Sequence, residues 1–366
     1  MDILKKIYLL MLLTAMAMGL TSCYTEFDPL IDSTPVLCMN STITPDEPVT
    51  LFLSRTWNWT EGDESKLDLD VRNAEVRLIV NGEFKETLKP TTVNIPTHMS
   101  NPYPEERDCY QSEYLAECGD IIRLEAYSEQ YGEASAEVRV PYPVPLDRLE
   151  AVDVDCKVRS GDISEFPIAA SPCTFLLNFN LLAYLTDPSE STDHYDLAVG
   201  YTPSCEYNEE TYAFIYGSYP WIDFSNEPLF KGHASVLESA VAGMYGFSGY
   251  TIFSDRQING RTYPLRLGCN DISFAYQNPS DRPEPKEFGI KVTLRHIDSV
   301  YYKHVISVWK GNDGISGILG GVGLANPVYP YSNVSTGAGV VTAYAEASMT
   351  IPLADAVTIA EQKNNK

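Results

Sequence analysis

The cysteine thiols of this chain could form disulfides or bind a metal. Seven of the eight lie beyond residue 30, no Cys-x-x-Cys occurs, and none of the five histidines pairs at ligand spacing, which disfavours zinc. In an oxidising compartment these thiols would form disulfides, and their odd number leaves at least one free. We predict that Cys38 stays free and that the other six form three pairs: Cys109–Cys118, Cys156–Cys173 and Cys205–Cys269.

The pair Cys109–Cys118 has the strongest local support. Its eight intervening residues precede Gly119-Asp120, a turn that suits a closed loop. A disulfide across so short a loop would contribute about 2–3 kcal/mol by the chain-entropy model.

Aromatic side chains form a second set of candidates. Trp57 and Trp59 lie two residues apart, so on one strand they would share a face. The tract 205–250 is rich in tyrosine, phenylalanine, glycine and proline and includes Tyr216, Tyr219 and Trp221. Such rings offer rigid contact area for stacking on sugars or anchoring a protein partner. We predict these five as candidate ligand-binding residues, with packing in a core or loop as the alternative.

Other catalytic and metal-binding patterns are missing from the sequence. It has no G-x-S-x-G, no H-E-x-x-H and no phosphate-binding loop with its lysine. With 50 acidic residues, a pair of carboxylates can be nominated anywhere and indicates nothing by itself. We predict no enzyme activity, no cofactor and no metal site. Whether the acidic loop 61–70 binds calcium stays open, because it departs from the EF-hand order.

Composition narrows the classes further. The chain carries 26 basic and 50 acidic residues, a formal net charge of -24, and 44% of its residues are hydrophobic. That hydrophobic content is typical of a globular protein. The charge argues against nucleic-acid binding, which needs a basic face.

The N-terminus has the features of an export signal. Two lysines and an apolar run precede Leu20-Thr21-Ser22-Cys23, which resembles the bacterial lipobox. In that signal the cysteine thiol receives a diacylglyceryl group and the chain is cut before it, and a second and third acyl chain (palmitate among them) secure the anchor. We predict a signal peptide at 1–22, lipidation of Cys23 and a location in the outer membrane, on either face. An ordinary secretory signal is the alternative.

The elements that would position these residues are mainly strands. Alternating patterns predict strands at 74–80 and 84–88 around Asn81-Gly82, and others are predicted at 49–53, 121–127, 134–140, 149–158, 175–182, 195–201, 261–276, 288–297 and 339–351. Residues 90–108 carry four prolines and predict a long loop. One helix is predicted at 300–310, capped by Ser299.

These patterns predict an all-β protein. We expect a tether at 23–35, an immunoglobulin-like β-sandwich at 36–140 and a proline-rich linker at 141–148. A larger β-sandwich or barrel-like domain with one short α-helix follows at 149–353, and the tail 354–366 is predicted to be frayed.

Several short motifs recur in one family when taken in order. They include Phe253-Ser254-Asp255 with Gly260 and Tyr263, and the run from His296 to Lys303. The sharpest is Tyr331-Ser332-Asn333-Val334 with Gly337 and Gly339, against a signature of the form YSNI-x-GG-x-G-x-F. In this chain, Thr336 occupies the position of the first glycine in the GG pair of that signature. The chain resembles the domain of unknown function 4249 (DUF4249) family of Bacteroidota lipoproteins.

The resemblance implies a class of partner and no mechanism. Members are similar to outer-membrane lipoproteins that accompany TonB-dependent transporters. The expected function is therefore an accessory or ligand-capturing subunit of a TonB-dependent nutrient uptake system. The alternatives are a stand-alone glycan- or peptide-binding lipoprotein, and a surface adhesin or envelope-structural protein.

Overall fold

The structure is a computed structural model of all 366 residues. It describes residues 34–57, 61–62, 67–95, 105–159, 173–189, 191–202, 207–208, 213–215, 221–231, 251–276, 289–312, 317, 326 and 328–353. Residues Val36–Lys366 form one compact unit, and Met1–Pro35 form another. No helix in the described ranges is long and apolar enough to cross a membrane.

The described residues are mainly strands, which confirms the predicted all-β class. The first strands are β1 (Leu37–Ile43), β2 (Pro48–Arg55), β3 (Glu75–Val80), β4 (Glu83–Thr87), β5 (Lys89–Ile95), β6 (Glu105–Leu115), β7 (Ile121–Ser128) and β8 (Gly132–Arg139). The next are β9 (Leu146–Arg159), β10 (Cys173–Thr186), β11 (His194–Thr202), β12 (Tyr207–Asn208), β13 (Ala213–Ile215), β14 (Trp221–Asp223) and β15 (Ile252–Ser254). The last are β16 (Thr262–Tyr276), β17 (Gly289–Ile297) and β18 (Ala338–Pro352), with the helix α3 (Ser299–Asn312) before β18 and short 3-10 turns η3 (Pro228–Lys231) and η4 (Asp255–Gln257).

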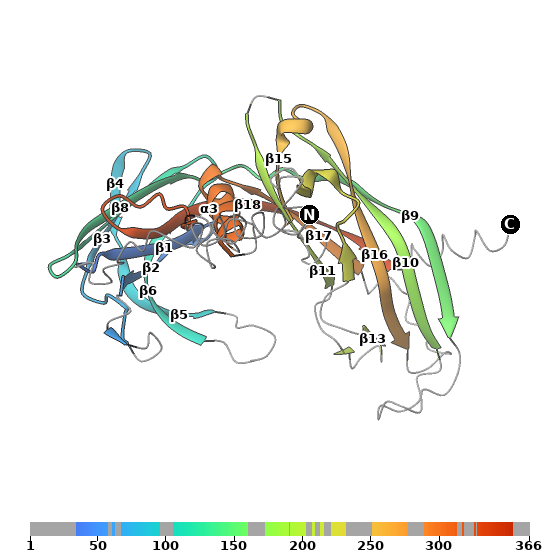
Figure 1. Ribbon diagram of the computed structural model, residues 1–366, viewed down its shortest axis with the longest axis horizontal. Coiled ribbons are helices and arrows are strands. Elements are labelled where there is room, and N and C mark those ends of the chain that lie inside the picture. Colours follow the sequence, from blue (N-terminus) through green and yellow to red (C-terminus); the bar gives the residue numbers. More distant parts are fainter. Residues whose placement is uncertain are drawn as a thin grey trace, which may run out of the picture. The chain divides into compact units, whose positions relative to one another are not determined.

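The strands form three sheets (Figure 1). An eight-stranded sheet has the order β15-β11-β17-β18-β1-β2-β6-β5, and a four-stranded sheet has the order β4-β3-β7-β8. A third sheet has the order β12-β13-β16-β10-β9, with β14 also paired to β16. The first and last strands, β1 and β18, are neighbours and run parallel (blue and red in Figure 1).

The buried hydrophobic side chains of the described residues form two separate cores. One is shared by β1, β2 and β6 with β3, β7 and β8, so two sheets enclose it as in a sandwich. The other is built mainly on β9, β10, β11, β16 and β17. Strand β18 contributes Val341 and Ala343 to the first core and Ile351 to the second. The change of core falls between Val140 and Val144, at the start of the predicted linker, and the eight-stranded sheet contributes strands to both cores. The predicted domain boundary stays a prediction.

Two turns show why particular residue types were needed. Asn81 and Gly82 both have positive φ, at 53° and 85°, as a two-residue type I′ turn between β3 and β4 requires. Gly339 has φ 93°, and a Cβ there would overlap the backbone of Met39 on the adjacent β1. The parallel pairing of β1 with β18 therefore needs glycine at this position of the signature.

The helix begins one residue earlier than predicted, and its cap is a different residue. Asp298, not Ser299, accepts hydrogen bonds from the backbone N–H groups of Val300 (2.9 Å) and Tyr301 (3.0 Å). Its Oδ1 also accepts from Ala343 N on β18 at 3.2 Å, so one carboxylate both caps α3 and fastens it to the sheet. A carboxylate is the stronger acceptor for these unpaired donors, which explains why it displaces the serine.

The predicted loop at 90–108 is wrong over much of its length. Strand β5 begins at Lys89, and β6 extends from Glu105 to Leu115 as its antiparallel partner. Pro90 is tolerated because β5 is the edge strand of the eight-stranded sheet, where a missing N–H costs no ladder hydrogen bond.

Candidate functional site

Three buried aspartates form a polar centre at one corner of the described structure. Asp187 follows β10, Asp193 precedes β11, and Asp255 follows β15. Each offers a carboxylate oxygen within 4.8 Å of the others, and the three residues are 2%, 4% and 1% exposed. The pairing of β11 with β15 brings Asp193 and Asp255 together, and Asp187 joins them from the end of β10 in another sheet. We call this group the aspartate cluster.

Neighbouring groups satisfy each carboxylate of the aspartate cluster. Asp187 accepts hydrogen bonds from the Tyr195 hydroxyl (2.6 Å) and from Gly260 N (3.1 Å). Asp255 accepts from the Asn259 side-chain amide at 2.9 Å. The cluster is therefore a connected network rather than three isolated charges.

His296 links this network to the proline-rich segment. Its Nδ1 donates to the Tyr142 carbonyl oxygen at 2.7 Å, because a carbonyl has no proton to give. Its Nε2 lies 3.1 Å from Asp193 Oδ1, and the Ser191 hydroxyl donates to Asp193 Oδ2 at 2.7 Å. The imidazole thereby connects Tyr142 to the corner formed by β10, β11 and β15.

Burial sets the electrostatics of this centre. It raises the pKa of Asp187, opposed by the hydrogen bonds from Tyr195 and Gly260, and the nearby Asp255 and Asp193 raise it further. Burial also raises the pKa of Tyr195, and the hydrogen bond to the Asp187 carboxylate raises it further. Burial lowers the pKa of His194. Each shift favours the neutral form, as expected where charge is removed from water.

The aspartate cluster is also where a hard cation would fit best among the described residues. Calcium takes roughly six to eight oxygen ligands, and three carboxylates with the Ser191 hydroxyl supply part of such a set. Each carboxylate already accepts at least one hydrogen bond within the fold, so the chain itself supplies partners for them. The arrangement accounts for a rigid structural corner without a metal.

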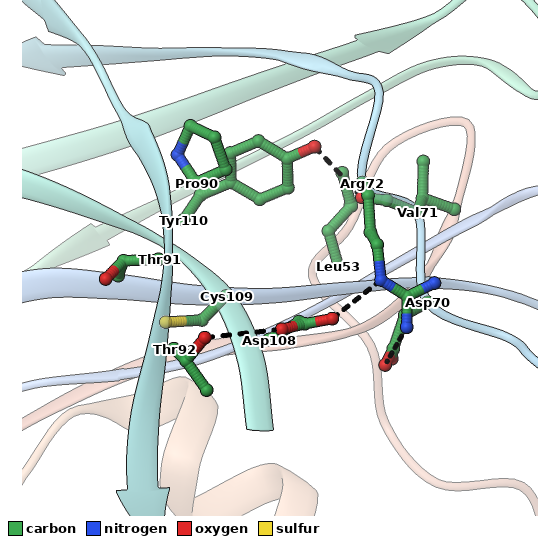
Figure 2. A pocket seen from close by; sticks show the side chains of 10 residues that line it. All are labelled: Leu53, Asp70, Val71, Arg72, Pro90, Thr91, Thr92, Asp108, Cys109 and Tyr110. Atoms are coloured by element: carbon green, nitrogen blue, oxygen red, sulfur yellow. Dashed lines mark hydrogen bonds and ion pairs between the residues drawn. The ribbon is translucent and has the colours of Figure 1, made fainter. Parts of the chain in front are cut away.

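A pocket of about 240 Å³ lies between β2, β5 and β6, with Arg72 at its rim (Figure 2). The Arg72 side chain binds the carboxylates of Asp108 (2.6 Å), Asp68 (2.7 Å) and Asp70 (3.5 Å). Hydrogen bonding to Asp68 and then to Asp108 raises the pKa of Arg72. The arginine is therefore occupied by the protein's own acids, and a ligand would have to displace them.

The acidic loop meets this same arginine. Two of its acids, Asp68 and Asp70, bind Arg72, and Glu61 binds Arg55 at 2.8 Å. Residues 63–66 lie outside the described residues. The described carboxylates of the loop thus face guanidinium groups, which leaves calcium binding by this loop without structural support.

The predicted aromatic residues are not brought together by the described structure. Trp57 is half-buried just beyond β2, and Trp221 begins β14, where its backbone pairs with Asn270. Trp59, Tyr216 and Tyr219 lie outside the described residues, as does Cys23. The aromatic binding surface and the lipidation stay predictions.

The predicted disulfide Cys109–Cys118 is wrong. Both residues are free thiols, and the pKa of each is raised, chiefly by burial. The eight residues between them are not a closed loop, because β6 continues to Leu115.

The other predicted pairs fare differently. Cys156 on β9 is opposite Leu177 on β10, four residues from Cys173, which corresponds to about 13 Å along the strand. That register contradicts the pair Cys156–Cys173. Cys205 lies outside the described residues. Cys269 is a buried free thiol whose pKa burial raises to about 12, so its predicted disulfide is not seen. Cys38 is free, as predicted.

The sequence analysis quoted several members of the polar centre without recognising their role. Asp255, Gly260 and His296 belong to the motifs of the family resemblance, and they converge on the aspartate cluster. Recurrence of polar residues in short separated motifs was the available signal. Asp187 and Asp193 carried no such signal, because their environment depends on strands distant in sequence.

The Tyr-Ser-Asn motif also joins separate elements. Asn333 donates to the Val341 carbonyl oxygen at 2.9 Å and accepts from Val341 N at 3.0 Å. Tyr331 is fastened to α3, where its N–H donates to the Ser307 hydroxyl (2.6 Å) and its carbonyl accepts from His304 Nδ1 (2.7 Å). The motif therefore attaches the segment before β18 to the helix and the sheet.

The architecture defines the chain as an all-β, sandwich-like protein with one helix among its described residues. A model of the family described as Domain of unknown function (DUF4249) matches residues 24–350. The chain belongs to this family. No curated protein and no solved structure matches it.

Proposed function

We propose that this chain is an outer-membrane lipoprotein anchored through Cys23. The observation that carries the proposal is the position of the family match, which begins at residue 24, directly after the cysteine of Leu20-Thr21-Ser22-Cys23. The family domain thus corresponds to the part that would remain after cleavage at the lipobox. Two or three acyl chains suffice for a stable anchor.

The anchor is tested by expression of the full chain with radiolabelled palmitate. The wild-type chain should incorporate label and sediment with outer membranes. The Cys23→Ser variant should lose the label and keep its leader peptide. Label retained in Cys23→Ser would contradict the proposal.

Within the membrane, we propose a binding role as an accessory or ligand-capturing subunit of a TonB-dependent uptake system. Support comes from the family membership and from the absence of a catalytic constellation in the described ranges. The acidic composition fits neither nucleic acid nor an anionic lipid surface as a partner.

Affinity purification of the tagged protein from detergent-solubilised outer membranes tests this role, with mass spectrometry of the proteins that follow it. A stoichiometric TonB-dependent transporter is the expected result. Recovery of the lipoprotein without any transporter would overturn the accessory role and favour stand-alone ligand binding or adhesion.

A further inference from the structure

The outer face of the four-stranded sheet carries a groove of about 430 Å³. Strands β3, β7 and β8 form its floor, and Ser335 and Thr336 form part of its wall. This volume lies within the range of small-ligand sites, roughly 300–1,000 Å³, whereas the pocket beside Arg72 lies below it. We call this feature the sheet groove.

The floor of the sheet groove presents an aromatic ring between two carboxylates. Tyr127 on the middle strand β7 is 55% exposed. Glu75 on β3 and Glu133 on β8 are its directly opposite neighbours. Adjacent strands are about 4.8 Å apart, so acceptors lie on both sides of the ring.

The next row of outward-facing residues supplies donors. Arg77 on β3 lies opposite Glu125 on β7, about 7 Å along the strand from Tyr127. Glu125 accepts from Arg77 Nη1 at 3.2 Å and from Arg123 Nε at 3.0 Å. A guanidinium has five N–H donors, and each arginine uses one of them in these contacts. Both arginines are about half exposed, so further donors face the solvent.

The wall of the groove is held in a strained conformation. Thr336 has φ 55°, a left-handed backbone that a β-branched residue rarely adopts and that costs about 1–3 kcal/mol. Its hydroxyl is 2.7 Å from the Glu133 carbonyl oxygen, and Ser335 pairs with Ser135 through the backbone. Strain of this kind concentrates at ligand-binding sites, and here it places a hydroxyl at the rim.

We propose that the sheet groove binds a neutral saccharide, with one sugar ring stacked on Tyr127. Hydroxyl groups both donate and accept, so they match a surface where carboxylates and guanidinium donors alternate. Three carboxylates (Glu75, Glu125 and Glu133) outnumber two arginines, which disfavours an acidic ligand. The proposal extends the ligand-capturing part of the proposed function, but it needs neither the lipid anchor nor a transporter.

The test is calorimetric titration of the full chain, purified in detergent, with maltohexaose, cellohexaose, mannohexaose and chitohexaose. Hexagalacturonic acid is the acidic probe, and a casein digest is the peptide probe. We expect at least one neutral saccharide to bind. Tyr127→Ala and Arg123→Gln should each raise its Kd about tenfold or more.

Matched controls separate the groove from other exposed side chains. Tyr329→Ala removes a 78% exposed tyrosine elsewhere, and Arg139→Gln changes an exposed arginine of β8 outside the groove. Both should bind like the wild type, and circular dichroism should show all four variants folded. The proposal is overturned if no neutral saccharide binds, if the groove variants bind like the controls, or if the acidic or peptide probe binds more tightly. Because no transporter is present in this assay, its outcome is independent of the affinity purification.

Discussion

The aspartate cluster and the sheet groove are both made of charged side chains, yet they differ in what satisfies those charges. In the cluster, the carboxylates are almost fully buried and find their partners in the fold, among them Tyr195, Asn259 and His296. In the groove, Arg77 and Arg123 share a single carboxylate and keep further donors toward solvent. Polar groups that satisfy one another stabilise a structure, whereas polar groups left to solvent are available to a ligand.

Arg72 shows that exposure alone does not separate the two cases. Its side chain is 49% exposed, similar to the 46% of Arg77, but three carboxylates surround it. The number of carboxylates that a guanidinium already binds, rather than its exposure, decides whether it is available to a ligand.

The largest expected effect follows from removal of His296. His296→Ala leaves Asp193 buried without its imidazole partner and releases the Tyr142 carbonyl. Leaving the buried Asp193 carboxylate short of one hydrogen-bond partner should lower the free energy of unfolding by about 1–3 kcal/mol, measured by urea denaturation. Glu125→Ala in the groove is the comparison variant and should lose far less. Equal losses in the two variants would remove the distinction between the regions.

Substitution of Asp187 should change how stability depends on pH. Because burial raises the pKa of Asp187, the native state holds its proton where the unfolded chain has released it. The free energy of unfolding therefore falls as pH rises from about 4 through the raised value. Asp187→Asn cannot ionise, so its melting temperature should fall less over that interval in a series of thermal scans. Asp271→Asn, at an exposed position, should follow the wild-type pH profile; a wild-type profile for Asp187→Asn would refute the assignment.

A smaller effect is expected at Arg72. Its ion pairs are solvent-exposed, so Arg72→Ala should lower the melting temperature slightly at low salt. At about 1 M NaCl, where the screening length is roughly 3 Å, the difference from wild type should disappear. A difference that persists at high salt would mean that the side chain contributes packing rather than charge.

The smallest effect on stability is expected in the groove. Tyr127→Ala removes an exposed ring and should change the free energy of unfolding by no more than about 0.5 kcal/mol. The measurement is urea denaturation beside the His296→Ala variant. A loss comparable to that of His296→Ala would show that Tyr127 supports the fold.

Local patterns predicted most of the strands because their physical cause is local. Asn81-Gly82 forms its hairpin turn since both residues tolerate positive φ, whatever the rest of the chain does. The helix predicted at 300–310 is observed at Ser299–Asn312, with Trp309 buried. Two predictions failed because they used local spacing alone. The prolines of residues 90–108 predicted a loop where β5 and the start of β6 lie. The short spacing of Cys109 and Cys118 predicted a closed loop, although β6 continues from Cys109 to Leu115.

The sequence by itself determined the all-β class, the turns, the position of the helix and the family of this chain, because these depend on residue periodicity and short motifs. Only the tertiary structure decided which charged residues become neighbours. Asp187 and Asp255 are separated by 68 positions, and Glu133 and Thr336 by 203, so their contacts depend on strand order rather than on spacing. A carboxylate has the same chemistry in either place. Burial and partners, which are set by the packing of distant strands, decide whether it supports the fold or faces a ligand.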